Sequence, residues 1–97
     1  MLESKIEKEL REKVRSLGGK AYKFSSPGNN GVPDRIVLYK GHSYFIELKK
    51  PGEDLTPRQK VVKKHFSKLG FEVYKIDSVE MVDKFVREVL QREVSTS

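Results

Sequence analysis

The stretch that decides the fold is residues 34–49, which read DRIVLYKGHSYFIELK. Two apolar runs, Arg35–Tyr39 and Ser43–Leu48, flank the dipeptide Lys40-Gly41. Apolar runs on either side of a short turn signal are typical of an antiparallel β-hairpin, although Lys-Gly is a poorer turn dipeptide than Asn-Gly. The stretch therefore predicts two paired strands at the centre of the fold.

The register of this hairpin brings acidic side chains together. A turn centred on Lys40-Gly41 makes Asp34 face Glu47, whereas a three-residue loop or a bulge would shift the pairing. Facing residues hold their Cβ atoms about 4.5–5.5 Å apart, so two carboxylates there repel each other unless a cation such as Mg²⁺ lies between them. Lys49 falls on the same face of the strand as Glu47, where an ammonium can stabilise the charge that develops on a phosphate.

The same charges have a plainer interpretation. Asp34 follows Pro33 and could be a simple turn residue, while Glu47 and Lys49 could pair along an exposed edge, where charged side chains prevent unwanted strand pairing. The apolar residues on both sides of Glu47 favour a buried strand instead. The spacing alone leaves both interpretations open.

The remaining elements follow from hydrophobic periodicity, capping residues and turn formers. They are a helix from Leu2 to Leu17 ended by Gly18-Gly19, a strand Lys20–Phe24, a loop Ser25–Gly31, a helix with Thr56 as N-cap and Val62, Phe66 and Leu69 as its buried stripe, a strand Phe71–Ile76, and a last helix capped by Asp77. This order, α-β-β-β-α-β-α, predicts an α/β fold. Because both faces of the hairpin strands are largely apolar, we expect a mixed sheet flanked by helices on two sides.

Composition narrows the class of protein. At 97 residues the chain fits one domain, expected over residues 1–92 with a frayed tail at 93–97. It has no cysteine, so a thiolate metal site is excluded. We expect a soluble, intracellular (cytoplasmic) protein, since no apolar run reaches the roughly 18 residues of a membrane span. The net charge of +6 favours a polyanionic partner such as nucleic acid.

The motif residues also resemble a known family. Gly31–Arg35 followed by Phe45–Lys49 resembles the signature of PD-(D/E)XK nucleases, and the chain from Glu3 to about Asp77 is similar to a standalone VRR-NUC domain. The helix ending in Gly18-Gly19, the strand end at Lys23–Ser25 and the segment Leu55–Gln59 extend the likeness. VRR-NUC domains are similar in layout to archaeal Holliday-junction resolvases, so the resemblance implies a restriction-endonuclease-like fold.

The resemblance also implies roles for single residues. Asp34 and Glu47 would bind Mg²⁺ or Mn²⁺, the carbonyl of Leu48 would be a further metal ligand, and Lys49 would assist catalysis. A glutamate of the first helix would face the site, and Glu3 and Glu7 are both candidates, each with a solvent-facing alternative.

Gln59 has two candidate roles. The resemblance implies that it supports the active site, while its position three residues after Thr56 suits a capping box. The two roles are compatible.

A basic face and a polar loop are candidates for contacts with DNA. No acidic residue occurs between Leu55 and Phe71, and the basic residues there are Arg58, Lys60, Lys63, Lys64 and Lys68. They form either a solvated surface or a phosphate track beside the site. The loop at 25–31, with Ser26 and Asn30, could contact a phosphate through its N–H groups or simply turn the chain.

From these features we expect a Mg²⁺- or Mn²⁺-dependent endodeoxyribonuclease that hydrolyses phosphodiester bonds in branched DNA such as four-way junctions. The alternatives are a nucleic-acid-binding module with a vestigial nuclease centre and a structural subunit that only retains the fold. The likeness to resolvases favours a homodimer. So does the broad apolar surface of the last helix (Phe85, Val86, Val89 and Leu90), unless that helix only covers the sheet.

Overall fold

The predicted hairpin forms the centre of the sheet. The computed structural model describes residues 4–91, and in it β2 (Arg35–Tyr39) pairs antiparallel with β3 (His42–Leu48). Tyr39 pairs with His42 and Ile36 with Phe45, which confirms the predicted register. Lys40 and Gly41 both have positive φ angles, 45° and 81°, as a two-residue hairpin turn that follows the twist of its strands requires.

Two further strands complete the sheet, whose order is β1-β2-β3-β4. β1 (Lys20–Lys23) pairs antiparallel with β2, and β4 (Val73–Ile76) pairs parallel with β3. A parallel partner needs a crossover connection, and α2 (Pro57–Lys68) supplies it.

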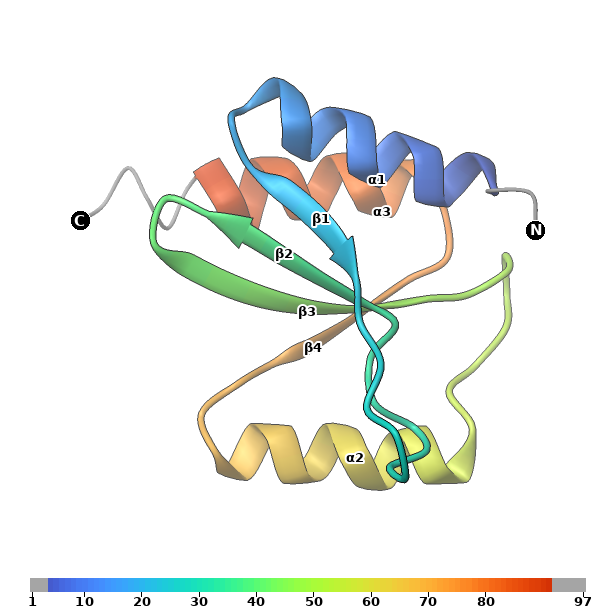
Figure 1. Cartoon of the computed structure of the whole chain (residues 1–97). Helices are drawn as coiled ribbons and strands as arrows, with labels where there is room; N and C mark the ends of the chain where they lie inside the picture. Colours follow the sequence, from blue (N-terminus) through green and yellow to red (C-terminus); the bar gives the residue numbers. More distant parts are fainter. Residues whose placement is uncertain (1–3, 92–97) are drawn as a thin grey trace.

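The helices lie on both sides of this sheet. α1 (Lys5–Ser16) and α3 (Val79–Phe85) cover one face, and α2 lies against the other (Figure 1). A short π-helix, η1 (Val86–Gln91), continues α3. The predicted α/β class with helices on two sides of a mixed sheet is confirmed. Among residues 4–91, none of the helices is both long enough and apolar enough to cross a bilayer.

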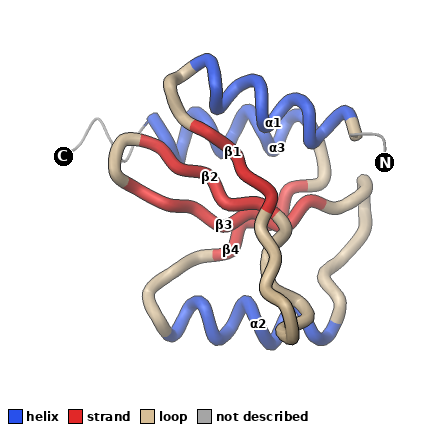
Figure 2. The backbone as a smooth tube through the Cα atoms, in the orientation of Figure 1, coloured by secondary structure: helices blue, strands red, loops and turns tan. Residues whose placement is uncertain are grey.

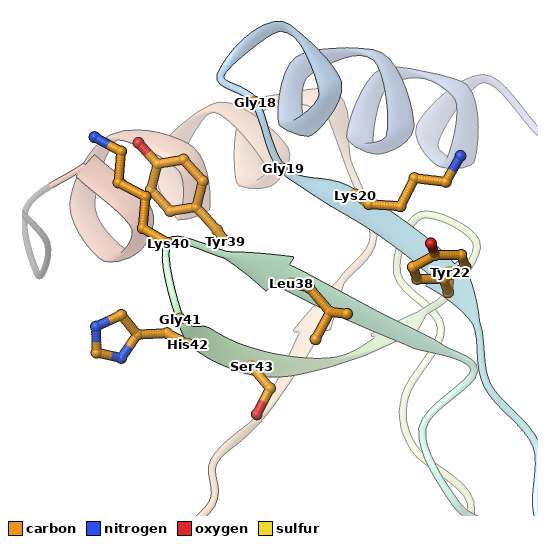
Figure 3. A pocket seen from close by; sticks show the side chains of 10 residues that line it. All are labelled: Gly18, Gly19, Lys20, Tyr22, Leu38, Tyr39, Lys40, Gly41, His42 and Ser43. Carbon is orange, nitrogen blue, oxygen red and sulfur yellow. The ribbon is translucent and has the colours of Figure 1, made fainter.

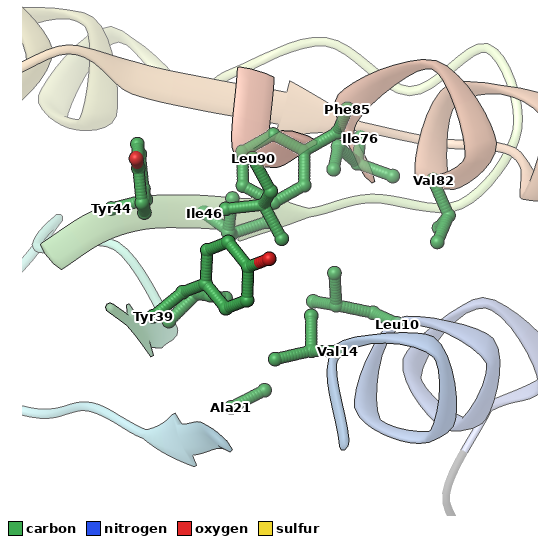
Figure 4. Packing of buried hydrophobic residues seen from close by; sticks show 11 residues of the cluster. Leu10, Val14, Ala21, Tyr39, Tyr44, Ile46, Ile76, Val82, Phe85 and Leu90 are labelled. Atoms are coloured by element: carbon green, nitrogen blue, oxygen red, sulfur yellow. The ribbon is translucent and has the colours of Figure 1, made fainter. Parts of the chain in front are cut away.

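The main hydrophobic core lies between the sheet and the α1–α3 layer. Leu10 and Val14 of α1 meet Val37, Ile46 and residues of α3 and η1, and all of these side chains are buried (Figure 4). On the opposite face an aromatic group joins α2 to the sheet, because the Phe45 ring contacts the rings of Phe24, Phe66 and Phe71. The hairpin strands are therefore packed on both faces.

Both termini of α1 differ slightly from the prediction. Its N-cap is Ser4, whose side chain accepts from the N–H of Glu7 while Glu7 accepts from the Ser4 N–H. The capping box is visible in the sequence, but the prediction did not use it and started the helix at Leu2, which lies outside the described residues. The helix ends at Ser16, one residue before the predicted Leu17.

The predicted stripe of α2 and the last strand also need correction. Leu69, expected to be buried, is 75% exposed because it caps the helix, and Phe71 is half exposed ahead of the strand, which starts at Val73. The N-cap of α3 is Ser78, not Asp77. Asp77 instead accepts a hydrogen bond from the N–H of Gly52 at 3.0 Å, so its carboxylate is directed to the loop after β3.

The last helix covers the sheet and leaves no broad apolar surface. Phe85 and Leu90 are buried, and Val86 and Val89 are half-buried against the same core. The expectation that these four side chains exceed the needs of the core was wrong, because α3 and η1 face the sheet together with α1. The apolar pattern of this helix therefore gives no support to dimerisation.

Candidate active site

The two predicted carboxylates meet at the open end of the hairpin. Glu47 lies in β3 and is only 5% exposed, and Asp34 comes directly before β2. The last residue pair of the β2–β3 ladder is Arg35 with Ile46, and continuing the same register by one residue puts Asp34 opposite Glu47. Asp34 Oδ1 accepts from the N–H of Leu48 at 3.1 Å, which fixes its side chain against the end of β3.

The protonation of these carboxyls reflects their crowding. Burial, followed by the charge of Asp34, raises the pKa of Glu47 from 4.5 to about 7, while the Lys49 ammonium acts in the opposite direction. Burial also raises the pKa of Asp34, against the hydrogen bond from Leu48. Glu53, which the sequence analysis did not single out, raises the pKa of Glu47 further. A bound cation would relieve this repulsion.

Gln59 makes the contacts that both of its candidate roles require. Its Nε2 donates to Glu47 Oε2 at 3.2 Å, and its Oε1 accepts from the N–H of Thr56 at 2.9 Å. The N–H of Gln59 in turn donates to Thr56 Oγ1 at 3.1 Å, completing the capping box of α2. The start of α2 is therefore joined directly to the Glu47 carboxylate.

The glutamate of the first helix is held by an arginine that the sequence analysis missed. Arg35 Nη2 lies 2.9 Å from Glu7 Oε2, and Arg35 Nη1 donates to the carbonyl of Ala21 at 3.3 Å. The charge of Glu7 contributes to the raised pKa of Asp34, so Glu7 faces the site. Arg35 is only 5% exposed. A charged residue at an inward position of an apolar strand is the sequence pattern that could have predicted a buried ion pair here. Glu3, the other candidate, lies outside the described residues.

Leu48 is the last residue of β3, and Lys49 comes directly after it. The N–H of Lys49 donates to the carbonyl of Ile76 at 2.9 Å, which ties the residue to β4. Its half-buried ammonium is near enough to Glu47 to lower the pKa of that carboxyl. The N–H of Leu48 donates to Asp34 Oδ1, so Leu48 lies directly beside the carboxylates.

The donor set suits a hard, oxygen-preferring cation. Within residues 4–91 there is no group of three or more His, Cys, Asp or Glu side chains arranged to hold a metal. Asp34 and Glu47 supply two carboxylates, and Mg²⁺ typically takes one or two, with water and phosphate oxygens as its other ligands. The site therefore fits Mg²⁺ or Mn²⁺ better than a metal that needs a closed protein cage.

The basic residues of α2 fall into two groups. Lys64 and Lys68 are exposed, and Lys60 lies 3.2 Å from Asp54 on the surface. The Lys63 ammonium instead donates to the carbonyl of Val73 at 2.6 Å and is half-buried, so it helps to fasten α2 to β4. Lys63 is therefore the least available of these cations for a phosphate.

Arg58 fastens the loop between β1 and β2, which descends to α2 (Figure 2). Arg58 Nε donates to the carbonyl of Asn30 at 3.1 Å. Gly31 has φ = 89° and packs so closely that a Cβ atom there would lie 2.9 Å from Arg58 Cγ. Ser26 Oγ accepts from Asn29 Nδ2 at 3.0 Å within the loop. The loop is thus anchored to the helix that positions Gln59.

Comparisons with known proteins agree with this fold. No family model matches the chain. Over 80 residues the chain is 48% identical to "Putative nuclease p44" of Acyrthosiphon pisum secondary endosymbiont phage 1, which covers 81% of this chain and 86% of that protein. A solved structure described as "VRR_NUC domain" superposes with a TM-score of 0.81 at 31% identity, covering 87% of this chain and 92% of the other. The chain therefore belongs to the VRR_NUC nuclease family.

Proposed function

We propose that the protein is a Mg²⁺- or Mn²⁺-dependent endonuclease that hydrolyses DNA phosphodiester bonds. The observation that carries this proposal is the Asp34–Glu47 pair, two carboxyls with raised pKa values held side by side by Leu48 and Gln59. Such a pair is unfavourable in a metal-free protein, and a divalent cation offsets the cost.

Each residue of the site has a defined part in this proposal. Asp34 and Glu47 hold the cation, with the Leu48 carbonyl as a further ligand, and Gln59 orients Glu47 through its amide. When bound, the cation supplies an acidified water and charge neutralisation at the scissile phosphate. Lys49 places a positive charge beside the same phosphate. Glu7, held by Arg35, orders the site from the α1 side.

The proposed substrate is branched DNA, and the proposed assembly is a homodimer. A four-way junction offers two scissile strands related by approximate two-fold symmetry, which a C2 dimer would match with two active sites. The likeness to resolvases supports this expectation, and the exposed cations Lys64 and Lys68 would follow the phosphates. Light scattering, together with cleavage of an immobile junction and a linear duplex, tests this proposal. A monomer that cuts both substrates equally fast would contradict the resolvase-like function and leave the proposed nuclease activity unaffected.

The decisive experiment is Asp34→Asn in a cleavage assay with Mn²⁺. The amide keeps the shape and can accept from Leu48, but it removes a charged ligand, so cleavage should fall by more than the roughly 100-fold typical of outer-shell changes, while DNA binding persists. Wild-type cleavage by this variant would overturn the metal site. If the wild-type protein binds DNA but shows no metal-dependent cleavage, the binding module with a vestigial centre is the correct function.

A further inference from the structure

The sheet face that carries the active site is only partly covered. α2 covers it around Phe45, but toward the β1 edge Tyr22 is 50% exposed and Leu38 is 42% exposed. Tyr22 pairs with Ile36, which pairs with Phe45, so strand alternation puts the Tyr22 side chain on the same face as Glu47. An exposed aromatic ring therefore shares the face of the candidate active site.

Tyr22 and Leu38 border a shallow cavity of about 510 Å³, the turn-end cavity, between the end of α1 and the β2–β3 turn (Figure 3). Its floor is set by Gly19, whose backbone passes so close to β2 that a Cβ atom there would lie 2.8 Å from the Leu38 carbonyl. Lys20 and Lys40 also line it. The cavity is open, and its rim carries cations.

The charge of this cavity has one sign. No lining residue is acidic, and among residues 4–91 neither Lys20 nor Lys40 has a carboxylate within ion-pairing distance. Each instead lies over an aromatic ring: Lys20 Nζ is 5.5 Å from the centroid of Tyr22, and Lys40 Nζ is 5.5 Å from that of Tyr39. The ring beside Lys40 is buried, but that beside Lys20 is exposed. A cation without a carboxylate partner beside an exposed ring, as at Lys20 and Tyr22, complements an anion that also has a flat apolar face.

We propose that the turn-end cavity binds an unpaired nucleotide of the nucleic-acid substrate, with its base on the exposed Tyr22 ring and its phosphate at Lys20. The inference rests on the proposed function. Aromatic stacking combined with flanking cations is the way in which proteins hold single strands without reading their sequence. A second copy of this chain is the rival occupant, but two copies would bring the same unpaired lysines together.

The position of Tyr22 relates this subsite to the scissile phosphate. Its ladder partner Ile36 is two residues from Asp34, or roughly 7 Å along a strand at ~3.3 Å per residue. That is about two steps of a stacked nucleic-acid strand at ~3.4 Å each. The Tyr22 ring would therefore hold a base close to the cleaved bond, with the phosphate two residues farther along the ladder at Lys20, whose partner is Leu38. Such a subsite would favour substrates that are unpaired there, such as branch points.

The test is a binding measurement in EDTA, so that cleavage cannot occur. Fluorescence anisotropy with a short labelled oligothymidine and a blunt duplex should show that Tyr22→Ala weakens single-strand binding by about tenfold or more, the typical loss for one stacked base, with little effect on the duplex. Tyr22→Phe keeps the ring and should bind as the wild type does. Lys20→Gln should lower the salt slope for the single strand by about 0.7, whereas Lys40→Gln should leave it unchanged, because Lys40 lies over Tyr39 on the other face of the sheet.

Matched controls lie on the far side of the molecule. Met81→Ala removes an apolar side chain that is 37% exposed, and Lys84→Gln removes an exposed cation, both from α3. Neither should change single-strand binding. Circular dichroism and light scattering on every variant show that its fold and its oligomeric state are those of the wild type.

Several outcomes overturn the inference. If Tyr22→Ala binds the single strand normally, or weakens single-strand and duplex binding equally, no base stacks on Tyr22. If that variant changes the oligomeric state, the face joins two copies of the chain. None of these results affects the proposed function, because catalysis is tested separately by Asp34→Asn; conversely, normal cleavage by Asp34→Asn would overturn the metal site and leave the anisotropy result standing.

Discussion

The two ends of the β2–β3 hairpin differ in how their polar groups are held. At the open end Asp34 and Glu47 are fixed by Leu48 and Gln59, and Glu47 is buried. Near the turn end, Lys20 of β1 stands at the rim of an open cavity beside the exposed Tyr22 ring. Chemistry at a phosphate requires groups fixed in advance, whereas binding a flexible strand requires accessible charge and ring surface. The proposed roles of the two ends follow this difference.

The largest expected effect at the open end, after loss of one of the two carboxylates proposed to bind the metal, comes from Lys49. We expect Lys49→Ala to slow cleavage by about 100-fold or more, as is typical when one charge-stabilising donor is lost. The variant should also bind the cation more tightly, because the two carboxylates lose a positive neighbour. Single-turnover cleavage and calorimetric titration with Mn²⁺ measure the two effects. Normal cleavage would make Lys49 an ordinary strand-end charge.

The raised pKa of Glu47 predicts how the metal-free fold responds to pH. The carboxyl titrates near 4.5 when unfolded and at about 7 when folded, so between these values the native state binds more protons. Stability in EDTA should therefore fall as the pH rises from about 4.5 to 7, by at most about 3 kcal/mol. Urea unfolding at several pH values measures this slope.

Glu47→Gln is the matched control for that slope, because it preserves the shape of the side chain and removes the titration. The variant should flatten the pH dependence between about 4.5 and 7 while it abolishes cleavage. An unchanged slope in this variant would assign the titration to other groups. In the wild type, Mn²⁺ should bind more tightly as the pH rises, since the cation displaces the proton from Glu47.

Gln59 should have a smaller effect, because it acts on Glu47 and not on the phosphate. We expect Gln59→Ala to lower activity by about tenfold, the lower end of the range for outer-shell partners. The matched control is Thr56→Ala, which weakens the helix cap at a cost of about 1 kcal/mol but leaves the Gln59 amide on Glu47. If both variants lose the same activity, Gln59 acts only through the stability of α2.

The smallest expected effect separates two neighbouring lysines. Lys64→Gln should weaken duplex binding a few-fold and lower the salt slope by about 0.9 without a change in stability. Lys63→Gln should chiefly destabilise the fold, because the Lys63 ammonium bonds the Val73 carbonyl. Salt titrations of binding and thermal melts, run on both variants, distinguish the roles. Identical behaviour of the two would contradict the division of the basic face.

The hairpin and its register were predictable because local sequence encodes them. The turn at Lys40-Gly41 and the two-residue alternation fix which side chains face each other, and this places Asp34 beside Glu47. The family resemblance pointed to Gln59 and Glu7. Their contacts with Glu47 and Arg35 could not be predicted from local sequence, because they depend on how α2 and α1 dock on the sheet. The surplus apolar surface predicted for the last helix was wrong for the same reason. How much of its apolar surface the core covers depends on the packing of this helix on the sheet beside α1.

The mixed direction of the sheet also has a consequence for the order of folding. β2 and β3 are joined by a two-residue turn, whereas β4 reaches β3 only after the chain closes a long crossover through α2. Strands that are close together in the sequence lose less loop-closure entropy when they pair, and they form sooner. We therefore expect the Asp34–Glu47 pair to assemble with the hairpin, so that the repulsion within it opposes an early step of folding. Substitutions at the pair should change the folding rate, whereas those in β4 should chiefly change the unfolding rate.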